Sequence, residues 1–156
     1  MSMKRRLFLK RTATASVVGA ALSAGLLQPR AVLAAWPKSA FKADDVNAAL
    51  TELFGMADVA DSADISLKAP DIAENGAVVP ITVTTSLPNV ESIAIVVENN
   101  PSPLAASFNL GSNAGGYVST RIKMGKTSNV LAVVKSGGKL YKGTKEVKVT
   151  IGGCGG

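Results

Sequence analysis

Hydrophobic positions recur with two different periods along this chain, and the first of them is helical. Four hydrophobic side chains between residues 44 and 54 share one stripe of a 3.6-residue helix: Val46, Leu50, Leu53 and Phe54. Asp44 belongs to the residue types that cap helix N-termini, and Gly55 stands where glycine commonly ends a helix. The pattern therefore predicts an amphipathic helix over residues 44–54.

From residue 64 onward the period changes to two, which is typical of β-strands. The segments rich in β-branched residues are 65–69, 77–85, 92–98, 104–110, 117–124, 130–135, 139–141 and 146–151. Turn-forming residues separate them, among them Asn75-Gly76, Gly137-Gly138 and Gly143. Seven or eight short strands at this spacing predict a mostly β fold, an immunoglobulin-like antiparallel β-sandwich with one N-terminal helix.

Charge changes this picture less than the totals suggest. The 156 residues carry a formal net charge of +6, from 17 basic and 11 acidic residues. Six of the basic residues and none of the acidic ones lie in residues 1–34, so the remaining 11 basic residues balance the 11 acidic ones. A neutral domain of this kind argues against nucleic-acid binding.

Within residues 35–156 the charges are segregated along the sequence. Residues 35–100 hold three lysines and ten acidic residues, whereas residues 101–156 hold eight basic residues and one acidic residue. Two interpretations stay open. The strands can interleave into ordinary solvated faces, or the C-terminal strands can present a basic face to an acidic partner or an anion.

Composition also excludes several kinds of catalysis. The chain contains no His, so Ser-His-Asp and Cys-His catalysis and His-ligated metals are excluded. One Cys leaves no internal disulfide and no iron–sulfur cluster. We therefore expect no resident cofactor or metal, and a chain that is not an enzyme.

The first 34 residues have the pattern of an export signal. Arg5 and Arg6 begin a twin-arginine motif that continues through Phe8, Leu9 and Lys10. An uncharged stretch runs over residues 12–29, and Val32-Leu33-Ala34 has the small residues of a signal-peptidase site. We predict a twin-arginine signal peptide over 1–34, cleavage to a periplasmic protein starting at Ala35 or Trp36, and no membrane anchor after cleavage. Because this route exports folded cargo, it also suggests a partner bound before export.

The C-terminus carries the chemistry. The predicted last strand runs directly into Gly152, Gly153, Cys154, Gly155 and Gly156. Glycines lose the most conformational entropy on ordering, so we expect 152–156 to form a flexible arm beyond a β-sandwich domain of residues 35–151. At about 3.5 Å per residue this arm reaches roughly 17 Å. A lone thiol in an exported protein indicates intermolecular pairing or a deliberate reactive group, so Cys154 is the predicted attachment site.

This tail resembles that of the SoxY family, the carrier subunits of the bacterial Sox thiosulfate-oxidising system. The resemblance also covers the twin-arginine signal and the segments 40–42, 69–80, 97–101, 120–124 and 149–151. It implies a carrier that holds thiosulfate-derived groups on Cys154. It further implies a SoxZ-like heterodimer partner, loading by the haem enzyme SoxAX, release of sulfate by SoxB and, where present, oxidation by a sulfane dehydrogenase.

Two rival hypotheses fit parts of the same sequence. A terminal Gly-Gly is also found in ubiquitin-like carriers that hold sulfur as a thiocarboxylate, here on Gly156, but that activation needs ATP. An exported adhesion or structural sandwich is the other alternative, in which Cys154 merely forms an intermolecular disulfide. Gly111–Gly116 lacks the lysine and hydroxyl of a phosphate loop, and Asp58, Asp61 and Asp64 lack the glycine and glutamate of a calcium loop.

Overall fold

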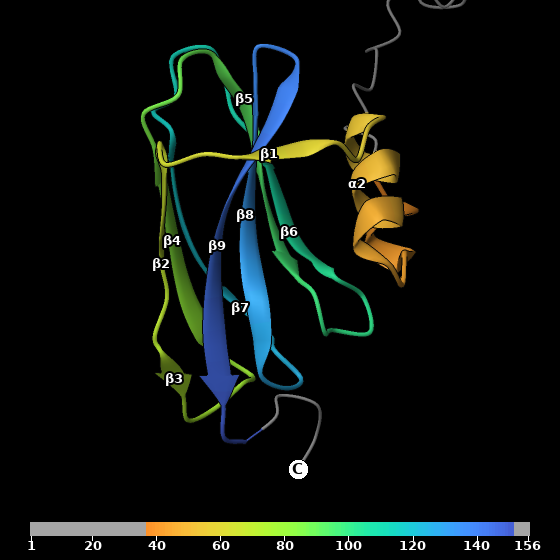
Figure 1. The fold of residues 1–156 in the computed structure, drawn as a ribbon, viewed down its shortest axis with the longest axis vertical. Coiled ribbons are helices and arrows are strands. Elements are labelled where there is room, and N and C mark those ends of the chain that lie inside the picture. Colours follow the sequence, from red (N-terminus) through yellow and green to blue (C-terminus); the bar gives the residue numbers. More distant parts are fainter. Residues whose placement is uncertain (1–36, 152–156) are drawn as a thin grey trace, which may run out of the picture. The chain divides into compact units, whose positions relative to one another are not determined.

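A computed structural model describes residues 37–151, which form two facing β-sheets with a helix on the outside of the larger one (Figure 1). The larger sheet has the strand order β1-β9-β8-β5-β6, and β3 also pairs with β9. Its strands are β1 (Val59–Asp61), β3 (Ile72–Ala73), β5 (Val90–Val97), β6 (Leu104–Asn109), β8 (Ser128–Ser136) and β9 (Lys139–Val149). The predicted mostly β sandwich with one N-terminal helix is confirmed.

The smaller sheet has three antiparallel strands in the order β2-β4-β7. They are β2 (Ile65–Lys68), β4 (Val79–Thr85) and β7 (Tyr117–Ile122). Residues of β4 alternate between buried and more exposed positions, because one face of this sheet packs on the core and the other faces solvent. The strands predicted over 65–69, 77–85 and 117–124 are therefore present in this sheet, and the one predicted over 104–110 is β6 of the larger sheet, each with shorter ends.

The main core lies between the two sheets and consists of aliphatic side chains. The fully buried ones with the largest volume include Ile81, Ile93, Ile95, Val130, Val134 and Val147. In β5, however, the residues between these positions are buried too, because Ala94 and Val96 belong to a second cluster on the opposite face. Central strands covered on both faces read as continuous hydrophobic runs, which explains the lack of alternation over 92–97.

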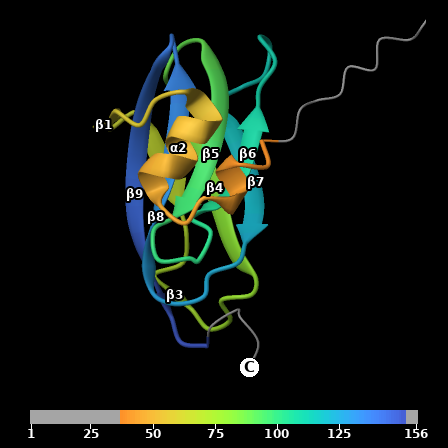
Figure 2. The same cartoon turned by 90° about the vertical axis from the view of Figure 1, so that its right-hand side faces the viewer.

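The second cluster forms where the helix packs on the outer face of the larger sheet (Figure 2). Helix α2 (Val46–Phe54) buries Ala49 and Leu50, and the short 3₁₀ helix η1 (Ala40–Lys42) adds Ala40. The predicted cap was one residue early. Asp45, rather than Asp44, has extended backbone angles and accepts a hydrogen bond from the Ala48 amide at 2.9 Å. Gly55 ends the helix with a φ of 77°, as predicted.

Strand β9 differs most from the sequence prediction. Two strands, 139–141 and 146–151, were expected on either side of a turn at Gly143, but β9 is continuous and ends at Val149. Gly143 lies opposite Ala132 of β8 in the ladder. A Cβ atom there would lie 3.0 Å from both the carbonyl oxygen and Cγ2 of Ile65, in the other sheet. This glycine therefore permits a close approach of β2 and is not a turn residue.

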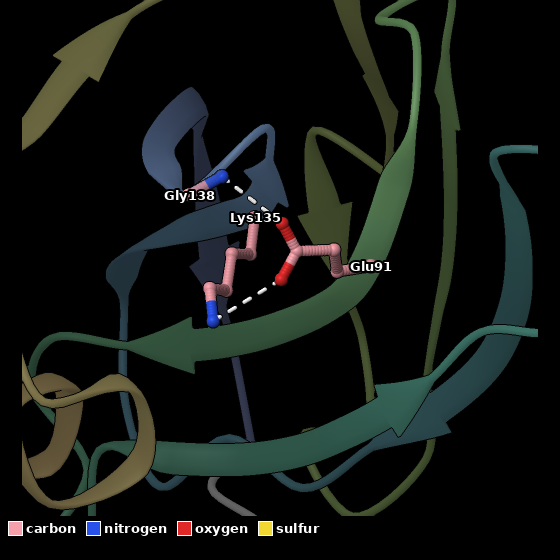
Figure 3. A network of polar contacts seen from close by, with 3 residues as sticks. All are labelled: Glu91, Lys135 and Gly138. Atoms are coloured by element: carbon pink, nitrogen blue, oxygen red, sulfur yellow. Dashed lines mark hydrogen bonds and ion pairs between the residues drawn. The ribbon is translucent and has the colours of Figure 1, made fainter.

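The β8–β9 hairpin turns at Gly137 and Gly138, which both have positive φ and match the predicted turn. Glu91 of β5 joins this turn to the sheet (Figure 3). Its carboxylate accepts the Gly138 amide at 3.0 Å and lies 3.2 Å from the Lys135 ammonium. The hydrogen bond from the Gly138 amide lowers the pKa of Glu91 most, and the Lys135 ammonium lowers it further, because both stabilise the carboxylate.

Candidate functional site

The site is built from the end of β9, the strand that precedes the predicted arm. Val147 and Val149 point towards the core between the sheets, while Lys148 is exposed, so the strand keeps its period of two almost to its end. Beside it lies β3, whose residues Ile72 and Ala73 pair in parallel with Lys148 and Val149 (Figure 1). The sequence pattern gave no strand at 72–73, because two residues are too short to show a period.

Three hydrogen bonds fasten the chain just beyond β9. The amide of Thr150 donates to the carbonyl of Ala73 at 3.1 Å, and its hydroxyl donates to the carbonyl of Glu74 at 3.1 Å. The amide of Gly76 donates to the carbonyl of Ile151 at 2.8 Å. The loop after β3 therefore holds both residues that follow the strand.

A second loop, residues 123–127, also contacts the end of β9 and the loop after β3. The amide of Val149 donates to the hydroxyl of Thr127 at 2.9 Å, and the amide of Met124 donates to the carbonyl of Gly76 at 2.7 Å. Segments 71–78, 123–127 and 148–151 thus converge at one end of the domain. Sequence reasoning identified Asn75-Gly76 as a turn, and the Asn75 side chain does accept the Ala77 amide at 2.8 Å. Nothing in the pattern marked Thr127 or Thr150 as anchors.

Ile151 is the last described residue, and its side chain is 64% exposed. Gly152, Gly153, Cys154, Gly155 and Gly156 lie outside the described residues, and so does the predicted signal with Arg5 and Arg6. The structure therefore locates Ile151, the residue from which the predicted arm begins. Cys154 follows Ile151 by three residues, a span of at most about 10 Å in extended backbone.

The charges of the two sequence halves mix in space. Lys135, Lys142 and Lys145 of the basic half form ion pairs with Glu91, Asp61 and Asp71 of the acidic half, at 3.2, 3.8 and 2.9 Å. The interleaved arrangement holds for these three lysines. Three others lie on the converging segments, are exposed, and make no ion pair with a described residue: Lys123, Lys126 and Lys148.

The described residues hold no group of three or more His, Cys, Asp or Glu side chains that could bind a metal ion. No helix within residues 37–151 is long and apolar enough to cross a membrane.

Comparison with known proteins decides the family. The model of the family described as sulfur oxidation protein SoxY matches residues 50–154. The chain belongs to the SoxY family. The match extends to Cys154, the residue that the sequence singles out. Among curated proteins none matches the chain.

A solved structure agrees with this assignment. The sulfur carrier protein SoxY from Chlorobium limicola is 48% identical, with a TM-score of 0.60, over 66% of this chain and 94% of that one. A superoxide reductase (neelaredoxin) from Ignicoccus hospitalis is 18% identical over 55% of this chain and 79% of its own, with a TM-score of 0.49. As a SoxY protein, the chain is a sulfur carrier of the Sox system and not an enzyme.

Proposed function

We propose that this SoxY protein carries thiosulfate-derived groups covalently on Cys154, at the end of an arm formed by residues 152–156. The observation that carries the proposal is the anchoring of Thr150 and Ile151 to the loop after β3, three residues before the thiol. A fixed origin and a short glycine segment allow the thiol to enter a narrow cleft while the domain stays outside. The glycines add no side chains to obstruct entry.

The proposed chemistry uses the thiol as a handle. Loading joins Cys–SH and thiosulfate as Cys–S–S–SO₃⁻, releasing one proton and two electrons, and the haem enzyme SoxAX would accept those electrons. SoxB would then add water to the terminal sulfone, releasing sulfate and two protons and leaving Cys–S–S⁻. A sulfane dehydrogenase would oxidise the remaining sulfur. The carrier supplies no acid, base or metal in this scheme, since the partner enzymes supply the catalytic groups.

We further propose the partner and the export route. SoxY proteins pair with SoxZ in the Sox system and typically work in the periplasm. A SoxZ-like protein bound in the cytoplasm would be exported with this chain, which would explain a twin-arginine signal on a chain without an expected cofactor. We place the signal over 1–34, the β-sandwich domain over 35–151 and the arm over 152–156.

One experiment tests the carrier site and the processing together. Intact mass of the periplasmic protein from thiosulfate-grown cells is measured before and after reduction, for the natural chain and for Cys154→Ser. The natural chain should start at Ala35 or Trp36 and carry a reducible sulfur adduct, whereas Cys154→Ser should carry none and should still bind its partner. An adduct that persists in Cys154→Ser would refute this attachment site, and one on Gly156 would favour a thiocarboxylate carrier.

A further inference from the structure

The end of the domain from which the arm leaves carries both exposed apolar and unpaired basic side chains. We call this surface the root face and define it by Ile72, Val78, Lys123, Lys126, Lys148 and Ile151. We propose that the root face is the docking surface for the enzymes that act on Cys154, and that these enzymes surround the mouth of their cleft with an acidic rim and an apolar spot. This inference rests on the proposed carrier function and adds the character of the partner surface.

The length of the arm places the partner here. Ile151 is held by the Gly76 amide, and at most about 10 Å of extended backbone separates it from Cys154. An enzyme that reacts with the thiol inside a cleft must therefore bring the mouth of that cleft against the root face. No other surface of the domain has to be covered during every such encounter.

The apolar part of the root face is unusual for this domain. Five large hydrophobic side chains of the described residues are exposed, and three of them belong to this face: Ile72, Val78 and Ile151, at 58%, 52% and 64%. Ile72 lies on β3 beside Lys148, Val78 follows the loop that holds Ile151, and the same loop contacts Met124. Exposed hydrophobic side chains gathered at one end are typical of an interaction site.

The charged side chains of the root face determine which sign of charge a partner surface must carry. Lys123 and Lys126 flank Met124 and Thr127, the residues that support the root, and Lys148 lies on β9. The carboxylates on the same segments are Asp71, which is paired with Lys145 at 2.9 Å, and Glu74, which makes no ion pair with a described residue. Three further charges border this surface and make no ion pair with a described residue: Arg121, two residues before Lys123; Glu146, two residues before Lys148; and Glu98, whose carboxylate accepts the Asn129 side chain. Four unpaired cations against three unpaired glutamates leave an excess of one positive charge, which attracts an acidic rim and speeds encounter at low salt.

A charge-reversal experiment tests the docking surface. The triple variant Lys123→Glu, Lys126→Glu, Lys148→Glu is compared with Lys139→Glu, because Lys139 is also exposed and unpaired but lies at the β8–β9 turn, at the opposite end of β9. Each purified heterodimer is loaded without enzyme by tetrathionate, whereby Cys–S⁻ displaces thiosulfate to give Cys–S–S–SO₃⁻. Intact mass confirms equal loading before sulfate release by the hydrolase is measured at several salt concentrations.

The root-face triple variant should lose about tenfold or more in kcat/KM near 0.01 M salt, mainly through KM, and the loss should shrink as salt is raised. Lys139→Glu should change kcat/KM less than about twofold at any salt, as expected for a charge far from the contact. Equal losses in both variants, or no loss in the triple variant, would overturn the proposal. A loss confined to kcat would also overturn it, because the lysines would then act on the cargo and not on docking.

The apolar spot has its own variant. Ile151→Ser with Val78→Ser should raise KM at all salt concentrations, whereas Met56→Ser, which also removes an exposed hydrophobic side chain, should not. Unchanged KM in the double variant would remove the apolar spot from the proposal. Failure of the carrier function itself is separate, since it would appear as tetrathionate adducts or sulfate release that do not depend on Cys154.

Discussion

At the scale of single residues, Gly143 allows the two sheets to pack closely because it has no side chain. Its position in β9 faces Ile65 of β2, and a Cβ atom there would lie 3.0 Å from the Ile65 carbonyl oxygen. The oxygen belongs to the backbone, so relief of the contact requires the strands to separate. We therefore expect Gly143→Ala to destabilise the domain by about 1–3 kcal/mol, the cost typical of overpacking. Denaturant unfolding of the mature domain measures this.

Gly111→Ala is the matched control for that prediction. Gly111 has no neighbour within 4 Å of a Cβ atom, and its φ does not lie in the left-handed region. Its substitution should leave the free energy of unfolding within about 0.5 kcal/mol. If Gly143→Ala were equally neutral, the contact between β9 and β2 would not be tight, and Gly143 would need another explanation.

The same glycine explains an error of sequence interpretation. Glycine between strand-like segments usually marks a turn, and the pattern alone cannot distinguish a turn glycine from one selected for a close approach. The distinction depends on Ile65, which is 78 residues away along the chain. Gly55 and Gly137-Gly138 were assigned correctly, because a helix end and a hairpin turn depend on neighbours in the sequence.

At the scale of elements, Glu91 couples β5 to the β8–β9 hairpin in a pH-dependent way. Its pKa is lowered from 4.5 by the Gly138 amide and the Lys135 ammonium, so the folded state favours the carboxylate. The resulting stabilisation is present above the ordinary pKa and is lost as the pH falls through the lowered pKa. Glu91→Gln should therefore lower the melting temperature at pH 7, and the two melting curves should converge at acidic pH.

Glu52→Gln provides the comparison for that pH series. Glu52 is exposed on α2, and its side chain makes no hydrogen bond or ion pair with a described residue. Glu52→Gln should leave the melting temperature nearly unchanged at each pH, because the Glu52 side chain makes no such contact. A difference between natural chain and Glu91→Gln that is constant from pH 7 to pH 3 would show that Glu91 acts through packing instead of charge.

The elements themselves were largely predictable from the sequence, and the exceptions have physical reasons. The helix and the longer strands follow from the 3.6-residue and two-residue periods, and the family resemblance rested on motifs that the chain itself carries. The root of the arm was not predictable, because β3 has only two residues and its contacts with Lys148 and Val149 are long-range. Thr127 and Thr150 hold this end of the domain through their hydroxyl groups, but nothing in the sequence distinguishes them from other surface threonines.

At the scale of the whole molecule, the proposed function predicts a separation of stability from activity. Gly153→Leu and Gly155→Leu should leave the melting temperature nearly unchanged, with less than about 0.5 kcal/mol lost, because we expect the arm to add nothing to the core. They should nevertheless block turnover, since an added side chain must enter the partner's cleft. Thermal unfolding and thiosulfate-dependent turnover measure the two effects. Normal turnover would mean that the glycines do not serve a narrow cleft.

The continuity of β9 also has a mechanical consequence. In the proposed function, withdrawal of the arm from a partner's cleft would apply force to β9 at its C-terminal end. Nine residues of β9 pair in register with β8, and β1 and β3 pair with its other edge. Backbone hydrogen bonds in such ladders run across the strands, so a pull along β9 loads them together in shear and does not open them one at a time. This pairing would let the proposed arm be withdrawn repeatedly without separating β9 from the domain.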